Sequence, residues 1–169
     1  MPRDIIEIGG YTTHSIGKKL SNFYPRAFVF DGVACASLEG IIQALKCPDE
    51  SIQIELCKLV GKEAKKAGEA YTARWQETQT LYWKGVAYKR DSSEYILLFM
   101  RIYDTVYEQD PTLQEHLLAL GDADIRHSIG CPHASRTTLT EEGMMWNLER
   151  LRRRAVQERY AALFATLRT

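Results

Sequence analysis

The sequence lacks the features that mark several common classes of protein. Its 169 residues include only 5 prolines and 11 glycines, too few for a collagen-like or low-complexity chain. The 22 basic and 22 acidic residues cancel, so no overall field draws the chain toward nucleic acid or an anionic membrane. No apolar run reaches the roughly 18 residues of a membrane span, and the N-terminus lacks the apolar segment of a secretion signal. We therefore expect a cytoplasmic protein that neither spans nor binds a membrane.

Metal and cofactor motifs are also missing. The four cysteines fit no zinc spacing, and we interpret them as free thiols. The four histidines have no ligand-like helical spacing, and there is no glycine-rich dinucleotide loop or P-loop. We therefore expect neither a metal nor a cofactor. The residues concerned are Cys35, Cys47, Cys57 and Cys131, with His14, His116, His127 and His133.

The chain has instead the composition of a globular protein. It is 45% hydrophobic and 26% charged, and its length suits a single domain over residues 1–169. Residues 4–12 predict an opening strand, and residues 26–36 predict a hairpin that turns at Asp31-Gly32. Most of the remainder predicts helix. The expected fold class is therefore α+β, a predominantly helical domain with a small early β-sheet or hairpin.

Capping residues and hydrophobic spacing predict the helices, and Ser37 is the expected N-cap of the first of the longer ones. A core-facing stripe at helical spacing is expected on the helix that ends near residue 108, at Tyr95, Leu98, Phe99, Ile102 and Val106. The stretch 68–83 has no clear period, and 121–136 is predicted to be loop. A basic run at 150–154 is either a solvated helix face or a ligand-binding element. The expected helices span 38–47, 49 or 51 to about 67, 91 or 92 to about 108, 111–120, and a last one after residue 140.

Glu39, Gln43 and Lys46 form a polar edge on the first of the longer helices. At about 100° per residue they fall within about 60° of one another, opposite an apolar side. A carboxylate and an amine about 10 Å apart on a helix could act on two ends of one ligand. Glu39 would then be a general acid or base, and Lys46 an electrostatic partner or nucleophile. The same pattern also describes the solvated face of an amphipathic helix, and periodicity leaves both interpretations open.

Four short motifs occur in a fixed order: LSNFYP at 20–25, FDGV at 30–33, SLE at 37–39 and QALK at 43–46. This ordered set resembles the signature of the NADAR/YbiA-like N-glycosidase family, and fainter similarity continues to about Leu151. The resemblance implies an α-rich α+β enzyme that hydrolyses the N-glycosidic bond between a phosphorylated ribose and an amine or base. It implies a small-molecule nucleotide or ADP-ribosyl substrate. The class includes ADP-ribosylated guanine, also within nucleic acid, and phosphorylated riboflavin-pathway intermediates.

The resemblance also implies roles for individual residues. Glu39 and Lys46 match the family's catalytic positions, and the lysine amine would attack the opened ribose to give a Schiff base that water releases. Asn22 matches an asparagine that would bind the substrate, although an Asx-type turn would also explain it. Trp83 matches an aromatic position that would stack on a base, although core packing would explain it equally. The other expected substrate-binding residues are Phe23, Gln43, Lys84, Arg90, Asp122 and His127.

The phosphates of such a substrate need local basic groups, among which the sequence does not choose. His127 would bind phosphate, relay a proton or be structural. It lies in residues 123–130, where the chain departs from the L-V-E and W-G pattern of many family members, which indicates a different sub-branch and substrate. The phosphate candidates are Lys18, Lys19, Lys84, Arg90 and Arg126.

Two other functions stay open at this point. The chain would be a binding module for ADP-ribose-like ligands if it had the fold without turnover, but the presence of both Glu39 and Lys46 favours an enzyme. It would be an interaction protein if the Met- and Leu-bearing last helix and its arginine run docked a partner, although such a stripe is more often core or dimer interface. The sequence does not predict the oligomeric state.

Overall fold

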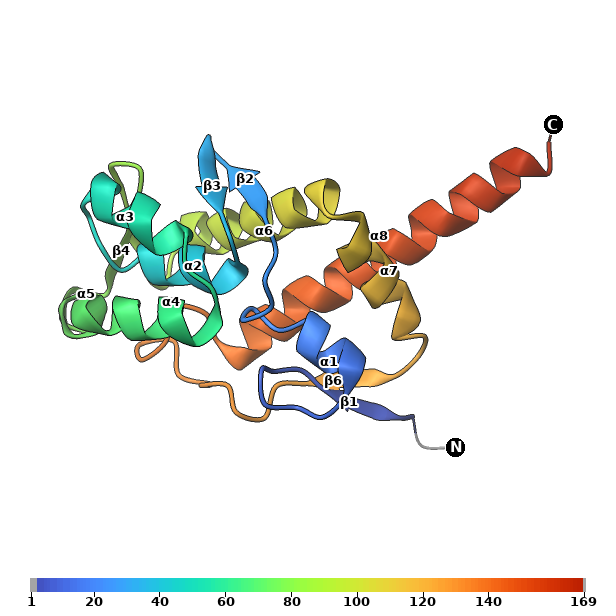
Figure 1. The fold of residues 1–169 in the computed structure, drawn as a ribbon, viewed down its shortest axis with the longest axis horizontal. Coiled ribbons are helices and arrows are strands. Elements are labelled where there is room, and N and C mark those ends of the chain that lie inside the picture. Colours follow the sequence, from blue (N-terminus) through green and yellow to red (C-terminus); the bar gives the residue numbers. More distant parts are fainter. Residues whose placement is uncertain (1–2, 169) are drawn as a thin grey trace.

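The computed structural model describes residues 3–168, which form a helical body with three small β-sheets at its edges (Figure 1). This architecture confirms the predicted α+β class. The strands are β1 (Ile5–Glu7), β2 (Phe28–Phe30), β3 (Val33–Cys35), β4 (Thr80–Trp83), β5 (Val86–Lys89) and β6 (Asp124–Arg126). The helices are α1 (Ser15–Lys19), α2 (Leu38–Ala44), α3 (Glu50–Cys57), α4 (Gly61–Gly68), α5 (Thr72–Thr78), α6 (Ser93–Gln109), α7 (Pro111–Ala119) and α8 (Glu141–Thr166), with a 3-10 turn η1 (Glu69–Tyr71).

Each sheet has two strands, and only one of the three was predicted. Strands β2 and β3 pair antiparallel through Asp31 and Gly32, whose positive φ angles of 46° and 80° are those of the expected tight turn. Strands β4 and β5 form a second hairpin through Lys84 and Gly85, in the region without a clear period. Strands β1 and β6 pair in parallel although more than a hundred residues separate them, a contact that local patterns do not reveal.

The boundaries of two predicted helices were wrong. The single helix expected to end near residue 67 is two helices, α3 and α4, because the chain turns between them and Gly61 takes a φ of +54°. Helix α2 ends at Ala44, so Lys46 lies in the turn after it and not on the helix. The segment 121–136 was expected to be loop, but it contains β6.

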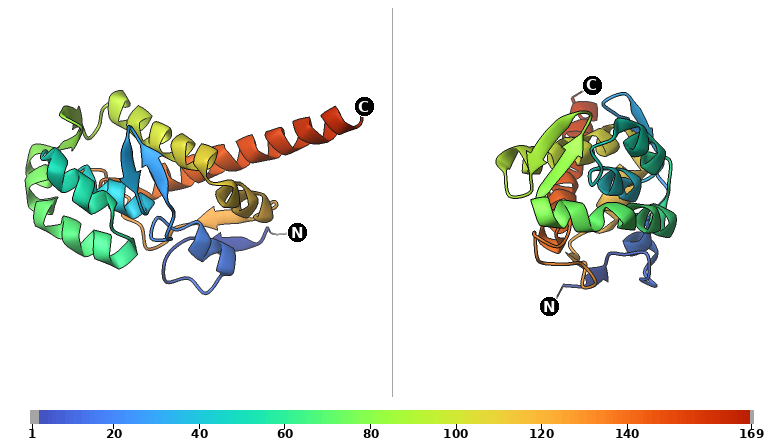
Figure 2. Two further views of the ribbon diagram at one scale, coloured as in Figure 1. Left: turned by 45° about the horizontal axis from the view of Figure 1, so that its top comes forward. Right: turned by 90° about the vertical axis from the view of Figure 1, so that its left-hand side faces the viewer.

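The core lies around α6. The stripe predicted on that helix is buried, and it packs with the first half of α8, where Met144, Leu148 and Leu151 are buried too. Beyond Ala155 every residue from 156 to 168 is exposed, and the last turns of α8 project from the rest of the protein (Figure 2). No helix within residues 3–168 is both long enough and apolar enough to cross a membrane. The buried stripe of α6 comprises Tyr95, Leu98, Phe99, Ile102 and Val106.

Helix α2 is held tightly against the corner between α3 and α4. The hydroxyl of Ser37 caps α2 by accepting from the amide of Gly40 at 3.0 Å, and it donates to the carbonyl oxygen of Leu59 at 2.9 Å. A Cβ added at Gly40 would lie 2.9 Å from the carbonyl oxygens of both Leu56 and Leu59. Only a glycine at position 40 therefore lets α2 approach this closely.

We expect Gly40→Ala to destabilise the protein by about 1–3 kcal/mol, the usual cost of overpacking a rigid contact. Thermal unfolding followed by circular dichroism measures the change. Gly143→Ala is the matched control, because its new Cβ would meet only side-chain atoms of Leu139 and Thr140, each at 3.1 Å, which can move. Equal melting temperatures for the two variants would contradict the close approach of α2.

Candidate functional site

A cavity of about 370 Å³ runs along α2 and is within the size range of small-molecule sites. Helices α4 and α5 form a second wall, and residues 10–11 and 21–23 close one end. Residues 127–140 cover the remaining side. Glu39, Gln43 and Lys46 all face this cavity and come from α2 and the turn after it.

The covering segment 127–140 is fixed at several points. The β1–β6 pairing places its start, where Nδ1 of His127 lies 2.7 Å from the carbonyl oxygen of Ile8. Because that oxygen only accepts, Nδ1 of His127 is the donor in this contact. Further along, backbone carbonyls of the segment accept hydrogen bonds from Gln76, Gln79, Arg90 and Tyr95. The cavity is therefore assembled from segments distant in sequence.

The carboxyl group of Glu39 is almost entirely removed from water. Glu39 is only 7% exposed, and one of its oxygens accepts a hydrogen bond from Nε2 of Gln43 at 2.7 Å. Burial raises the pKa of Glu39 above the ordinary value, although the Gln43 hydrogen bond and the charges of Lys65, Lys46 and His127 oppose the shift. Glu39 is thus disposed to hold a proton that it can donate.

The pKa of the Lys46 amine is shifted in the opposite direction to that of Glu39. Lys46 is 9% exposed, and Nζ donates to the hydroxyl of Thr72 at 3.0 Å. Burial lowers the pKa of Lys46, an effect that Lys65 reinforces and that Glu39 and Glu69 oppose. A larger fraction of this lysine is therefore neutral, and a neutral amine is a nucleophile. The polar edge is consequently not the solvated face of an amphipathic helix.

Asn22 and Phe23 line the end of the cavity near Glu39. The carbonyl oxygen of Asn22 accepts from the backbone amide of Glu39 at 3.0 Å, which ties the LSNFYP loop to the start of α2. The side-chain oxygen of Asn22 accepts from the hydroxyl of Tyr103 at 2.9 Å, and its Nδ2 contacts the sulfur of Met144. The orientation of the Asn22 amide is therefore fixed by the protein itself.

Two buried polar atoms at the cavity wall have no hydrogen-bond partner among residues 3–168. They are Oε1 of Gln43 and Nε1 of Trp75, and both side chains line the cavity. Gln43 also packs directly on α4, where a Cβ at Gly68 would lie 2.7 Å from its Cβ. Native interiors contain few such unpaired groups, and those that persist are often found at functional sites.

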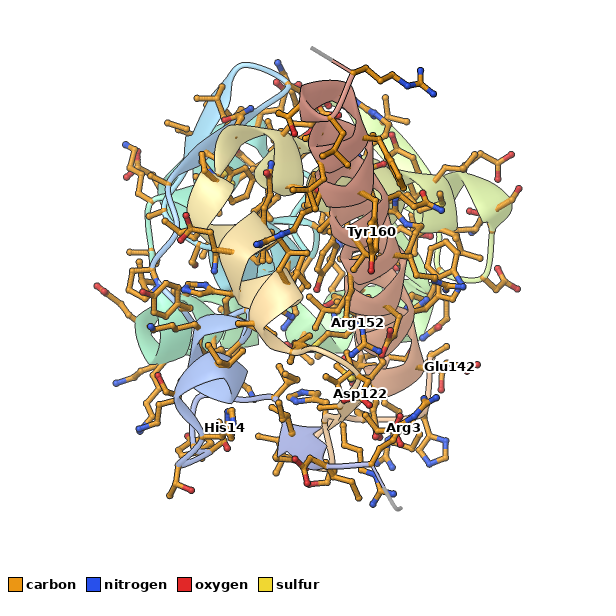
Figure 3. All side chains as sticks on the ribbon, turned by 90° about the vertical axis from the view of Figure 1, so that its right-hand side faces the viewer. Arg3, His14, Asp122, Glu142, Arg152 and Tyr160 are labelled. Carbon is orange, nitrogen blue, oxygen red and sulfur yellow. The ribbon has the colours of Figure 1, made fainter. Side chains whose placement is uncertain are left out.

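Four of the residues predicted to bind substrate lie outside the cavity. Trp83 is buried against Phe30, and its indole nitrogen donates to Asp31 at 2.9 Å, which makes it a core residue. Lys84 donates to the carbonyl oxygen of Asp31. Arg90 supports the cavity only indirectly, through its bond to the carbonyl oxygen of Thr137. Asp122 is exposed between α7 and β6 (Figure 3).

The cavity is lined by residues that sequence reasoning did not select. Lys65 from α4 and Arg136 from the covering segment line it, whereas Lys18, Lys19 and Arg126 do not. Tyr11 and Trp75 supply aromatic surface. The sequence near Lys65 offered one hint of its position, because Lys65 and Glu69 are four residues apart and so lie on one side of α4 and η1. The positions of Arg136, Tyr11 and Trp75 depend on tertiary contacts alone.

Three of the four arginines in the run at 150–154 form ion pairs away from the cavity. Arg150 pairs with Asp104, Arg152 with Glu149, and Arg154 with Glu158. None of them lines the cavity. Residues 3–168 contain no group of three or more His, Cys, Asp or Glu side chains that could hold a metal, and Cys35, Cys47, Cys57 and Cys131 are free.

Comparison with known proteins gives three matches. A family model described as bacteriophage protein GP30.3 matches residues 14–153. The uncharacterized 17.1 kDa protein in the Gp30-rIII intergenic region of Enterobacteria phage T4 is 32% identical over 123 residues, 73% of this chain and 80% of that protein. The NMR structure of the E. coli protein YbiA has a TM-score of 0.62 at 19% identity, covering 95% of this chain and 89% of that chain.

These matches bear on the resemblance noted in the four sequence motifs. The YbiA match shows the fold, so the predicted YbiA-like fold is confirmed. The GP30.3 family is one of the NADAR clan, which agrees with the ordered motifs at 20–46.

The burial of the Glu39 carboxyl should make the stability of the protein depend on pH. Below the ordinary glutamate pKa, the group is protonated in both the folded and the unfolded chain. Between the ordinary pKa and the raised pKa only the unfolded chain loses this proton, so the free energy of unfolding falls across that range and stays lower above it. Glu39→Gln keeps the acceptor for Gln43 and removes this loss. We expect the variant to be more stable than wild type at pH 7–8 by about 1 kcal/mol, or about 2–4 °C in Tm.

Thermal unfolding between pH 4 and pH 8 checks this, because the gain should disappear at the acid end. Glu69→Gln is the control, since Glu69 also lines the cavity but is exposed. A Glu39→Gln variant that loses stability at neutral pH would show that the carboxylate is well solvated or well paired.

Proposed function

The chain belongs to the bacteriophage protein GP30.3 family, and on this premise we propose that its cavity hydrolyses an N-glycosidic bond of a ribosyl-phosphate or ADP-ribosyl adduct. The observation that carries the proposal is the buried pair on α2 and the turn after it, in which burial favours a protonated Glu39 and a neutral Lys46. A proton donor and an amine nucleophile along one wall can together cleave such a bond.

The reaction uses each member of the pair in one role. Glu39 donates a proton as the ring oxygen leaves the anomeric carbon, which opens the ribose and leaves a C=N bond to the departing base. Nζ of Lys46 adds to that carbon, and the base departs with a proton, so the sugar is held as an imine on Lys46. Water then adds to the imine carbon, the bond to Lys46 breaks, and the proton released in this step returns to the Glu39 carboxylate. The products are the free base and the sugar phosphate aldehyde, and the amine is regenerated.

The two ends of the cavity favour one orientation of the substrate. At the Glu39 end, Phe23 and Tyr11 offer aromatic surface for a planar base. Lys65 adds a positive charge 5.8 Å from the Phe23 ring centre. In the proposed orientation the leaving base therefore stacks near Glu39, and the adjoining ribose ring oxygen lies within reach of the Glu39 proton.

The Lys46 end suits the phosphate. The hydroxyl of Thr72 lies 3.0 Å from Nζ of Lys46. Arg136 lines the same cavity, and Nε2 of Gln76, on the same helix as Thr72, donates to its backbone carbonyl oxygen at 2.9 Å. An arginine binds phosphate through two parallel hydrogen bonds. The ribose then lies between the two ends, with its anomeric carbon near Nζ of Lys46.

The test is to incubate wild type, Lys46→Ala and Glu39→Gln with ADP-ribosylated guanosine and, separately, with a phosphorylated aminopyrimidine riboside. Released base and sugar phosphate are followed by mass spectrometry, with borohydride added to reduce any imine. We expect wild type to cleave one substrate and to gain a reduced sugar phosphate on Lys46. Lys46→Ala should trap nothing, and Glu39→Gln should be slower by about 10²–10⁴-fold, the usual contribution of a general acid.

Lys66→Ala is the matched lysine control, because Lys66 is exposed on α4 and does not line the cavity. A wild-type protein that binds ADP-ribose but cleaves neither substrate and traps nothing would contradict the enzymatic proposal. The cavity would then be a binding module for ADP-ribose-like ligands.

The pair also predicts a bell-shaped dependence of the cleavage rate on pH. The rate should rise as Lys46 loses its proton through a lowered pKa, and it should fall as Glu39 loses its proton through a raised pKa. The two apparent pKa values belong to the coupled pair. Initial rates across pH 5–10 measure the profile, and Glu39→Gln should lose the limb that reports Glu39. A profile for that variant identical in shape to wild type would remove Glu39 from the mechanism.

A further inference from the structure

The last turns of α8 extend beyond the body of the protein. Ala155 is the last buried residue of the helix, and every residue from 156 to 168 is exposed. Figures 1 and 2 show this part of α8 projecting away from the other elements. The projecting segment adds about 16 Å of helix at 1.5 Å per residue.

One side of the projecting segment is apolar. Val156, Tyr160, Leu163 and Leu167 are all exposed, the last by 81%. At about 100° per residue these four lie within about 60° of one another, and Phe164 lies at the edge of the stripe. Figure 3 looks from the C-terminal end of the molecule, with Tyr160 labelled on this helix. Scattered exposed apolar residues are common, but a contiguous stripe marks an interaction surface.

We propose that this stripe pairs antiparallel with the same stripe of a second copy of the chain. The successive spacings of the four residues are 4, 3 and 4, which is the apolar spacing of two-helix coiled coils. The order of these spacings is the same in both directions along the helix. A two-fold axis between residues 161 and 162 therefore places Val156 opposite Leu167, and Tyr160 opposite Leu163, twice each. Such self-complementarity is the requirement of a two-fold symmetric interface.

The proposed pairing rests on apolar side chains and not on charge. Glu158 and Glu108, the acidic residues where the projecting segment begins, are already paired with Arg154 of the same chain, at 2.8 and 3.3 Å. The contact between the two copies is therefore made by the stripe itself.

The proposed interface is small, and it is separate from the cavity. An overlap of about 16 Å of helix falls short of the roughly 800 Å² per partner of a standard stable interface, so the dimer should be weak and depend on concentration. No residue after Met144 lines the cavity. Variants of the stripe should therefore leave ligand binding and any cleavage unchanged, so the dimer and the proposed enzymatic function are tested independently.

Sedimentation velocity of the full chain from about 1 to about 200 µM tests the pairing. We expect wild type to shift from monomer to dimer, and Leu163→Glu to weaken the dimer by at least tenfold because it buries a charge at the two-fold. Ala162→Glu is the control, since it adds the same charge on the opposite side of the helix and should dimerise like wild type. Circular dichroism confirms that both variants are folded.

A mixture of Val156→Cys with Leu167→Cys tests the direction of the pairing. Under an added oxidant, antiparallel pairing joins one variant to the other by a disulfide, whereas parallel pairing joins each variant to itself. A wild-type protein that stays monomeric throughout, species that grow beyond the dimer, or equal effects of Leu163→Glu and Ala162→Glu would each overturn the proposal.

Discussion

The burial of two charged side chains on one short helix and the turn after it is the constraint on which the site depends. Glu39 and Lys46 are removed from water together with Gln43, and an isolated buried charge costs several kcal/mol unless it is neutralised or paired. No direct ion pair between Glu39 and Lys46 is present, so each is held by a single neutral partner, Gln43 or Thr72. Burial therefore moves both groups toward their neutral forms, and these are the forms that general acid and amine chemistry need.

The rest of the fold serves to keep this helix covered. The close approach at Gly40 presses α2 onto α3 and α4, and the loop at Asn22 is bonded to the start of α2. The parallel pair β1 and β6 delivers the covering segment, which is then held by side chains from α5, α6 and the turn after β5 at the far end. The small sheets thus hold loops in position, while the hydrophobic core around α6 stabilises the fold.

Short sequence patterns predicted the features of the fold that depend on residues close together in the chain. The hairpin at Asp31-Gly32, the cap at Ser37 and the buried stripe of α6 each follow from a few neighbouring residues. The motifs at 20–46 placed Asn22, Glu39 and Lys46 around one cavity, because these residues lie on two connected elements.

The parts that local signals missed depend on contacts between distant segments. Pairing of β1 with β6 and the placement of Arg136 over α2 have no signature within a window of residues. Trp83, for which stacking on a base and core packing were both left open, lies in the core, while Trp75 lines the cavity. An aromatic residue has the same local pattern in either place, and only the tertiary fold decides between them.

Burial should make the amine of Lys46 easier to deprotonate than that of an ordinary lysine. An NMR titration of the lysine ε-methylene carbons measures this property, with the Lys46 signal identified by its loss in Lys46→Arg. We expect Lys46 to titrate at a lower pH than the exposed lysines such as Lys58 and Lys66. We also expect its titration midpoint to fall further in Glu39→Gln, because the carboxylate favours the charged amine. If Lys46 titrated together with the exposed lysines, burial would not favour its neutral form, and the pair would lack its nucleophile.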